Sequence, residues 1–312
     1  MIFVFPGQGS QKVGMGKDVY DAFSCAKKVL QEIDDAISFK LSDLIFNGSE
    51  EDLKATENSQ PALFAVSMMF VKVLQQEFGV DVTEKAKFIA GHSLGEYTAL
   101  CCDKVLSIAD AAKILRIRGR EMSEAFPQNG GMAAILGLSM EKVEELVAKF
   151  SQDPSNENFL QIANDNCEGQ IVVSGYRKAI DQMISDAMNA GAKRALPLEV
   201  SGPFHSKLME PAVKPLKEAL ESVNFSAPIK PIISNVTAKA ETENFRELLL
   251  KQLVSPVRWR ESIKYAEQNS VKKCIEIGSG KVLTGLVKRI SPTIETFNVN
   301  SVESLKEFGK AV

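Results

Sequence analysis

The sequence contains little of the material from which disulfide frameworks and zinc sites are built. Five cysteines occur in 312 residues, with no C-x-x-C spacing and only one adjacent pair, Cys101 and Cys102. This pattern predicts neither a disulfide framework nor a metal site, and it favours a reducing compartment. We therefore expect no metal ligands among the functional residues.

Long hydrophobic runs are also absent. The chain has no stretch of about 18 apolar residues, so we expect no membrane-spanning helix and no membrane partner. The apolar run at the N-terminus, residues 1–5, ends at Pro6 and Gly7. Such a run is too short for a signal peptide or an anchor, and the cytoplasm is the expected location.

No block of basic residues appears, and the formal net charge is -3. Bulk nucleic-acid binding needs lysine and arginine to neutralise phosphates, so the charge pattern argues against a nucleic-acid partner. The chain is 45% hydrophobic and 25% charged, as is ordinary for a soluble globular enzyme. Its length exceeds the usual domain size of roughly 100 to 200 residues, which predicts a large core with an inserted or appended smaller unit.

The most informative stretch is a G-x-S-x-G motif at residues 91–95. It follows a short apolar run, residues 86–90, that predicts a strand, and it leads into a helical pattern from Leu94 to Cys102. A serine on a sharp strand-to-helix turn projects its hydroxyl away from the backbone, and the flanking glycines allow close packing. Ser93 is therefore a candidate nucleophile near the positive end of a helix, although such a motif also occurs by chance.

A second glycine-rich segment, residues 6–11, follows the strand predicted at residues 2–5. Its spacing fits neither G-x-G-x-x-G nor a G-K-[ST] ending, so a nucleotide loop is not indicated. Two interpretations stay open. The backbone N–H groups of this loop could face an anion or oxyanion, or the segment could be a plain tight turn.

One arginine interrupts the apolar face of the helix predicted over residues 107–126. Arg118 lies in the middle of the stripe formed by Ile108, Ala111, Leu115 and Met122. Burying an unpaired charge is costly, so Arg118 needs an anionic partner. That partner could be a carboxylate elsewhere in the chain, or it could be a substrate carboxylate held by the fork of the guanidinium.

The pattern of elements changes after residue 127. Strands and helices are predicted in the order β-α-β-β-α-β, which is the order of the ferredoxin-like unit. We therefore predict a small ferredoxin-like domain at residues 128–198, inserted in a large α/β domain formed by residues 1–127 and 199–312. The large domain is expected to have a parallel sheet, and the tail after Glu303 shows no clear signal.

A serine hydroxyl needs a neighbouring base, and histidine is the usual one. The chain has only two histidines. His92 directly precedes Ser93, and adjacent side chains on an elbow diverge, which leaves His205, just past a predicted strand. Its alternative role is that of a buried structural histidine. A catalytic triad would also need an acid, and no residue stands out; the candidates are Asp165, Asp181 and Glu199. A dyad whose histidine is oriented by a backbone carbonyl or an amide is at least as plausible.

Five segments carry a resemblance that is more specific than any single motif. They are F-P-G-Q-G-S-Q at residues 5–11, G-H-S-L-G-E-Y at 91–97, R-G at 118–119, G-P-F-H-S at 202–206 and Q-L-V-S-P-V at 252–257. In this order, and over nearly the whole chain, they resemble malonyl-CoA:acyl carrier protein transacylase. Ser279 departs from the pattern, because many relatives have proline in this Gly-Pro-Gly turn, and a looser turn is the expected effect.

The resemblance implies a ping-pong malonyl transfer of fatty-acid synthesis, on an α/β-hydrolase-like body with a ferredoxin-like insert. The malonyl group would pass from coenzyme A to Ser93 and then to the phosphopantetheine thiol of acyl carrier protein, with no bound cofactor. By the same match, His205 would be the base, the backbone N–H groups of Gln8 and Leu94 the oxyanion hole, and Arg118 the carboxylate ligand. The backbone carbonyl of Gln252 would orient His205.

Two other functions remain possible at this stage. An esterase would use the same serine and histidine but would transfer the acyl group to water. A non-catalytic subunit that binds a carrier protein would keep the fold without forming an acyl-enzyme. The joint presence of Ser93, His205 and Arg118 favours the transferase.

Overall fold

The computed structural model describes residues 1–126 and 129–311. Its larger sheet has the strand order β10-β9-β1-β2-β7-β8. The first five strands in this order are parallel, and β8 is antiparallel to β7. The strands are β1 (Ile2–Phe5), β2 (Phe88–Gly91), β7 (Ile232–Ile233), β8 (Ala240–Glu241), β9 (Lys273–Ile277) and β10 (Glu295–Val299). The chain therefore folds as an α/β protein with a mixed, mostly parallel sheet.

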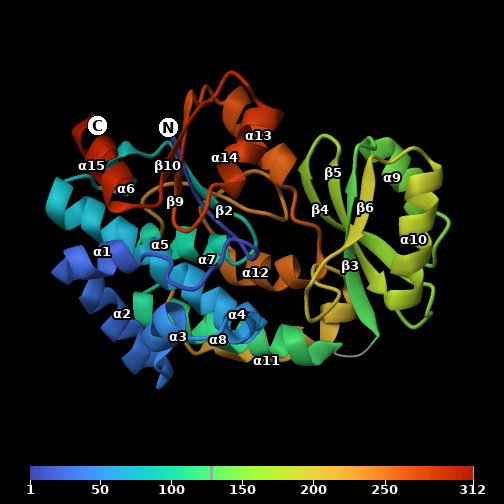
Figure 1. Cartoon of the computed structure of the whole chain (residues 1–312), viewed down its shortest axis with the longest axis horizontal. Helices are drawn as coiled ribbons and strands as arrows, with labels where there is room; N and C mark the ends of the chain where they lie inside the picture. Colours follow the sequence, from blue (N-terminus) through green and yellow to red (C-terminus); the bar gives the residue numbers. More distant parts are fainter. Residues whose placement is uncertain (127–128, 312) are drawn as a thin grey trace.

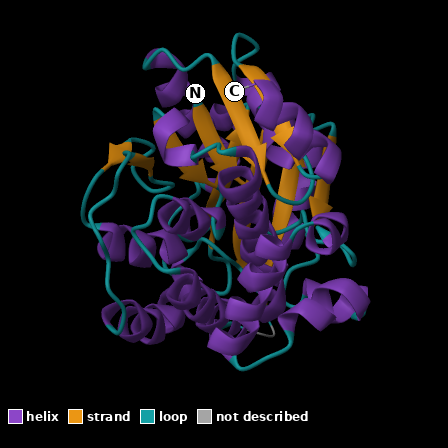
Figure 2. Ribbon diagram, turned by 90° about the vertical axis from the view of Figure 1, so that its left-hand side faces the viewer, coloured by secondary structure: helices purple, strands orange, loops and turns teal. Residues whose placement is uncertain are grey.

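Alternation along β1 decides what covers each face of this sheet. Phe3 and Phe5 pack into the main core, whereas Ile2 and Val4 pack into a second apolar cluster on the opposite face. Figure 2 shows the sheet between helices on both sides. The main core is formed with α1 (Lys17–Ala22), α2 (Ser24–Ile37), α3 (Leu41–Asn47), α4 (Glu50–Lys54), α5 (Thr56–Phe78), α6 (Val82–Lys85), α7 (Gly95–Cys102), α8 (Ile108–Ala125), α11 (Glu210–Glu221), α12 (Phe245–Val254) and α15 (Val302–Ala311); the second cluster is formed with α13 (Trp259–Gln268) and α14 (Val282–Ile290).

A second sheet lies to one side of this body (Figure 1). Its strands have the order β4-β5-β3-β6, and every neighbouring pair is antiparallel. Its elements are β3 (Gly130–Leu136), α9 (Met140–Val147), β4 (Leu160–Cys167), β5 (Gln170–Tyr176), α10 (Arg177–Asn189) and β6 (Arg194–Pro197). They enclose an apolar core of their own. The chain order is the predicted β-α-β-β-α-β, while the predicted boundary at residues 127 and 128 lies outside the described residues.

The register of the central strands fixes the place of the site. Ile2 pairs with Phe88, and Phe5 pairs with Gly91. Because β1 and β2 are parallel, the segment after Phe5 and the segment after Gly91 leave the sheet side by side at its carboxyl edge. The two glycine-containing motifs are neighbours for this reason.

The ends and breaks of several elements are visible only in the structure. Phe23, whose backbone is extended, separates α1 from α2, and β7 consists of only two residues. The tail after Glu303 was wrongly considered uninformative. It forms most of α15, in which Leu305 and Phe308 are buried, and the ring of Phe308 meets that of Phe3 at 6.1 Å.

Helices long and apolar enough to cross a bilayer do not occur in residues 1–126 and 129–311.

Candidate active site

Ser93 occupies a tight elbow between β2 and α7. Its φ angle is +52°, a left-handed value that is rare for a residue with a side chain. The glycines on either side make the elbow possible. A Cβ atom on Gly91 would lie 1.9 Å from the carbonyl of Gly95, and one on Gly95 would lie 2.3 Å from the carbonyl oxygen of Phe5. The G-x-S-x-G motif therefore has a steric basis at both glycines.

Replacing Gly95 with alanine should destabilise the fold, because the backbone of β1 blocks the new methyl group. We expect the free energy of unfolding to fall by about 2 to 3 kcal/mol. Gly285 is the matched control, because it is an exposed residue of α14 with open space around its Cα. Its change to alanine should raise the free energy of unfolding by about 0.5 to 1 kcal/mol. Denaturant titration of both variants measures the difference. Equal effects at the two positions would contradict the steric explanation.

His205 lies within hydrogen-bond distance of the serine. Its Nε2 atom is 2.8 Å from Oγ of Ser93, and its Nδ1 atom is 2.9 Å from the backbone oxygen of Gln252. A carbonyl oxygen can only accept, so Nδ1 carries the proton and Nε2 is free to accept the serine hydroxyl proton. The main chain thus fixes the imidazole in the tautomer whose free nitrogen faces the serine hydroxyl.

The imidazole of His205 is only 4% exposed. Burial, together with the charge of Arg118, lowers the pKa of His205 to about 3. Burial also lowers the pKa of His92. Near neutral pH both rings are therefore neutral, and His205 is in the form that can accept a proton.

Titration of the two histidines offers a direct check of this environment. In a ¹⁵N-histidine NMR titration, His205 should remain the neutral Nδ1-protonated tautomer from about pH 8 down to about pH 5, with no inflection near the ordinary value of about 6.5. The unfolded chain binds this proton below pH 6.5, whereas the folded chain does so only near 3, so stability should fall as the pH drops through this window. A His92→Gln variant assigns the signals. An inflection of the His205 signal near 6.5 would show a solvated imidazole.

Arg118 is 1% exposed and faces the serine from α8. Its Nη2 atom donates to Oγ of Ser93 at 3.1 Å and to Oε1 of Gln252 at 2.9 Å, and Nη1 donates to Oε1 of Gln60 at 2.6 Å. Nε has no acceptor. The side chain thus delivers a buried charge to the site and is held there by neutral amides.

The structural alternative for Arg118, an ion pair with a carboxylate of the chain, does not occur in the part of the protein that the structure describes. Its helix neighbours do form such pairs: Arg116 lies 3.8 Å from Glu57, and Arg120 lies 2.7 Å from Glu121. Burial lowers the pKa of Arg118, but a guanidinium remains protonated in proteins. The charge of Arg118 is therefore available to a ligand.

A cavity of about 300 Å³ opens onto these groups. Gln8 and Leu94 contribute to its wall, and their backbone N–H groups have no protein acceptor within the described chain. Unpaired N–H groups beside a nucleophile can stabilise an oxyanion. The wall also contains apolar side chains from both sheet units: Met122, Met132, Val172, Leu198, Val200 and Phe204.

None of the three residues considered as triad acids forms a hydrogen bond to His205 in the described chain, although Glu199 lines the cavity. Asp165 pairs with Arg260 at 2.9 Å, and Glu199 pairs with Lys54 at 3.4 Å. Asp181 is exposed on α10. Within the described residues, the acceptor for Nδ1 of His205 is the main-chain carbonyl of Gln252 and not a carboxylate.

A buried polar network behind Ser93 was not predicted from the sequence. Oε2 of Glu96 accepts from Nε2 of Gln252 at 2.6 Å and from the backbone N–H of Asn235 at 3.1 Å. Oδ1 of Asn235 accepts from the backbone N–H of Ser93 at 2.7 Å. The available signal was the charge of Glu96, three residues after Ser93 in a helix whose other residues are uncharged.

The turn at residues 278–280 is tied to the first glycine-rich loop. Oγ of Ser279 donates to the backbone oxygen of Ser10 at 2.7 Å. Serine in place of proline was expected to loosen this turn, but its hydroxyl supplies a contact to the loop that contains Gln8. The expectation of a looser turn stays a prediction.

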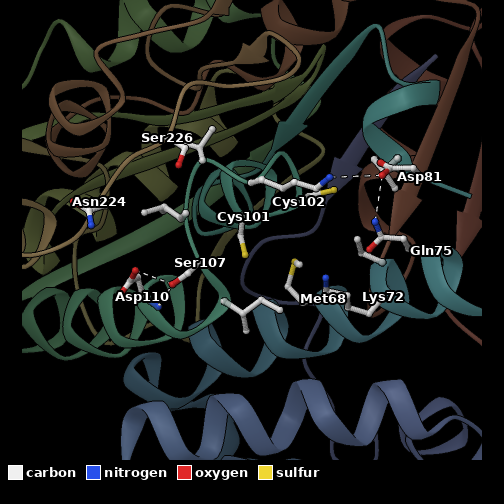
Figure 3. Close-up of a pocket in the computed structure, with 16 residues that line it drawn as sticks. Met68, Lys72, Gln75, Asp81, Cys101, Cys102, Ser107, Asp110, Asn224 and Ser226 are labelled. Carbon is white, nitrogen blue, oxygen red and sulfur yellow. Dashed lines mark hydrogen bonds and ion pairs between the residues drawn. The ribbon is translucent and has the colours of Figure 1, made fainter.

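A second cavity, about 460 Å³, lies between α5 and the segment that joins α7 to α8 (Figure 3). It contains the adjacent cysteines, which are both buried free thiols. Burial raises the pKa of Cys101 and of Cys102, so neither provides a thiolate near neutral pH. Within residues 1–126 and 129–311, no three His, Cys, Asp or Glu side chains are grouped to hold a metal ion.

A serine on a strand-to-helix elbow, a neutral imidazole and unpaired N–H groups are the parts needed for acyl transfer. The chain also matches the acyl transferase domain family over residues 2–304. It is an acyltransferase by this evidence.

Similar proteins of known name indicate which kind of acyltransferase this chain resembles. The chain is 45% identical over 307 residues to the malonyl CoA-acyl carrier protein transacylase of Bacillus subtilis strain 168, covering 97% of this chain and 94% of that protein. It is 39% identical over 306 residues to the enzyme of the same name from Escherichia coli K12, covering 97% and 96%. The chain belongs to the malonyl CoA-acyl carrier protein transacylase family.

Solved structures agree with this assignment. The acyl-carrier-protein-S-malonyltransferase from Bartonella henselae superposes with a TM-score of 0.95 at 47% identity, over 99% of this chain and 98% of that one. A malonyl-transacylase in complex with a type II PKS acyl-carrier protein superposes with a TM-score of 0.94 at 38% identity, over 100% and 99% of the two chains.

Proposed function

We propose that this protein transfers a malonyl group from malonyl-CoA to the phosphopantetheine thiol of acyl carrier protein, through a malonyl ester on Ser93. The observation that carries the proposal is the buried guanidinium of Arg118. It lies 3.1 Å from the serine hydroxyl and has no carboxylate partner in the described chain. A substrate that carries its own carboxylate beside the reacting carbonyl satisfies this charge.

In the first half-reaction, Oγ of Ser93 attacks the thioester carbonyl while Nε2 of His205 takes the hydroxyl proton. The C–S bond then breaks, and His205 returns the proton to the departing thiolate of coenzyme A. In the second half-reaction the carrier-protein thiol gives its proton to His205 and attacks the serine ester. Ser93 leaves with that proton, so the cycle is ping-pong and consumes no bound cofactor.

The oxyanion formed in each half-reaction would be held by the backbone N–H groups of Gln8 and Leu94. A donor of this kind is worth roughly 3 to 4 kcal/mol to the transition state. The parallel pairing of β1 with β2 supports the assignment, because it sets the segment after Phe5 beside the elbow. Gln252 would contribute its backbone carbonyl, which accepts from Nδ1 of His205.

Selection of malonyl over acetyl would come from Arg118, because only the malonyl group brings a carboxylate to the buried charge. Phe204 lines the same cavity. Its bulk would crowd a branch at the second carbon of the acyl group. The two residues therefore suit a short, unbranched dicarboxylic acyl group.

The finer architecture belongs to the same proposal. We assign residues 1–127 and 199–312 to a hydrolase-like α/β domain and residues 128–198 to a ferredoxin-like domain. The strand order β4-β5-β3-β6 and the separate apolar core of this unit support the division. A cytoplasmic location fits a partner that is an acyl carrier protein.

Intact-protein mass spectrometry tests the proposed function. After mixing with malonyl-CoA, the protein should gain the mass of one malonyl group, and adding holo acyl carrier protein should remove that mass and place it on the carrier. Rapid release of free malonate in the absence of carrier protein would favour the esterase. Failure to form any acyl-enzyme would favour the non-catalytic subunit.

A further inference from the structure

The carboxyl group of Glu96 is buried beside the site without forming an ion pair in the described chain. Glu96 is 1% exposed in the first turn of α7. Its two closest hydrogen-bond donors, the amide of Gln252 and the backbone N–H of Asn235, are uncharged. A buried carboxyl group that forms no direct ion pair is costly, so its hydrogen bonds indicate what it does at the site.

The hydrogen bonds of Gln252 indicate that role. The side-chain amide presents a donor on one side and an acceptor on the other. Because Nε2 donates to Glu96, Oε1 is left facing Nη2 of Arg118 at 2.9 Å. The reversed amide would place its NH₂ group against the guanidinium, where two donors would meet. Glu96 therefore decides which face of the amide Arg118 encounters.

The same carboxyl group also holds the elbow through Asn235. Asn235 donates its backbone N–H to Glu96, accepts from the backbone N–H of Ser93 and donates Nδ2 to the oxygen of Gly91 at 2.7 Å. Gln252 adds a bond from Nε2 to the backbone oxygen of Ser93 at 3.1 Å. One carboxyl group is thus linked both to the arginine and to the turn that carries the serine.

We propose that Glu96 is a positioning residue for malonyl selection: it orients the Gln252 amide, which holds the Arg118 guanidinium at the serine hydroxyl. The proposal rests on the proposed function. Glu96 contacts neither the hydroxyl of Ser93 nor the imidazole, so it acts through Gln252 and Arg118. Burial raises the pKa of Glu96 to about 7, and Oε2 can accept both hydrogen bonds in either protonation state.

The experiment compares Glu96→Gln with Glu276→Gln. Glu276 is a matched control, since it is 0% exposed in β9 and accepts from backbone N–H groups of α14. Single-turnover acylation is measured with malonyl-CoA and with acetyl-CoA. E96Q should lower kcat/KM for malonyl-CoA by roughly tenfold or more, because the new amide no longer enforces one orientation of Gln252, and should change acetyl loading less than about threefold. E276Q should leave the ratio of the two rates unchanged.

A double-mutant cycle with Arg118→Ala separates positioning from general destabilisation. If Glu96 acts through Arg118, E96Q should have almost no further effect on malonyl loading in the R118A background. Equal loss of malonyl and acetyl loading, or additive effects in the double variant, would overturn the proposal. Should E96Q not fold, Glu96→Asp retracts the carboxyl group by one methylene and should show the same selective loss.

Failure of the proposed function can be distinguished from failure of the positioning role of Glu96. A wild-type protein that takes up no malonyl group would defeat malonyl transfer. The positioning role would then be read from a crystal structure of E96Q: it stands if the Gln252 amide is reversed or Arg118 has left Ser93, and it falls if both keep their present contacts.

Discussion

Replacing Ser93 with alanine is expected to abolish the acyl-enzyme. The variant should show no mass increase after mixing with malonyl-CoA, and transfer to acyl carrier protein should fall by roughly 10⁴-fold or more, as when a serine nucleophile is removed from other dyads and triads. The reason is geometric. The hydroxyl of Ser93 lies 2.8 Å from Nε2 of His205, and it also accepts a hydrogen bond from Arg118.

The control for this experiment is Ser123→Ala. Ser123 is a half-buried serine of α8 that bonds to the backbone of Gly119 and to Ser201, outside the cavity. It should load malonyl at the wild-type rate. Covalent labelling that persists in the Ser93→Ala protein would refute the assignment of the nucleophile.

Replacing Arg118 with alanine should be the next most damaging change, and a selective one. Loss of the guanidinium leaves the malonyl carboxylate buried without a partner, so acylation by malonyl-CoA should fall by roughly 10²- to 10³-fold. Acetyl-CoA has no such carboxylate, and its slow loading should fall by less than about tenfold or should rise. Competition between the two thioesters, followed by intact mass, measures the ratio directly.

Arg120→Ala provides the matched control, because Arg120 is an exposed residue of the same helix that pairs with Glu121. It should leave the ratio of malonyl to acetyl loading unchanged. An equal loss of both activities in the Arg118→Ala protein would mean that this arginine supports the fold alone.

The convergence of Ser93, His205 and Arg118 was predictable where the sequence carries a chemical requirement. A serine in G-x-S-x-G needs a base, and with two histidines in the chain the diverging direction of His92 left His205. A single arginine in an apolar stripe likewise demanded an anion. The resemblance singled out Gln8 within the glycine-rich loop and added Leu94 and the backbone of Gln252, which have no local signal of their own.

The supporting residues could not be found in this way. Gln60, Glu96 and Asn235 lie on three elements far apart in the chain, and nothing in the spacing of the sequence says that their side chains converge. A polar residue in a buried helix needs a hydrogen-bond partner, but the sequence does not show which residue that partner is. Only the packing of α5, α7 and the segment after β7 resolves these pairs.

The helix at the end of the chain could not be predicted for a related reason. The pattern of α15 places Leu305 and Phe308 on one face, but over ten residues such a pattern is weak evidence for a helix. It is stabilised by contact with aromatic rings of β1 and β10. Tertiary contacts, more than the local helix preference of the sequence, therefore determine the structure of the last ten described residues.

The acceptor that orients His205 belongs to the polypeptide itself. A substitution at position 252 changes the side chain but keeps the backbone oxygen. It therefore removes the side-chain amide and leaves the hydrogen bond from Nδ1 of His205 in place. A mutational survey would consequently report the loss of the side-chain contacts of Gln252 with Arg118, Glu96 and Ser93, and it would miss the contact of its backbone oxygen with the histidine. Chemical synthesis can replace the peptide bond after residue 252 with an ester, which makes its carbonyl oxygen a weaker acceptor. This change would measure the contribution of that oxygen, which side-chain substitution cannot test.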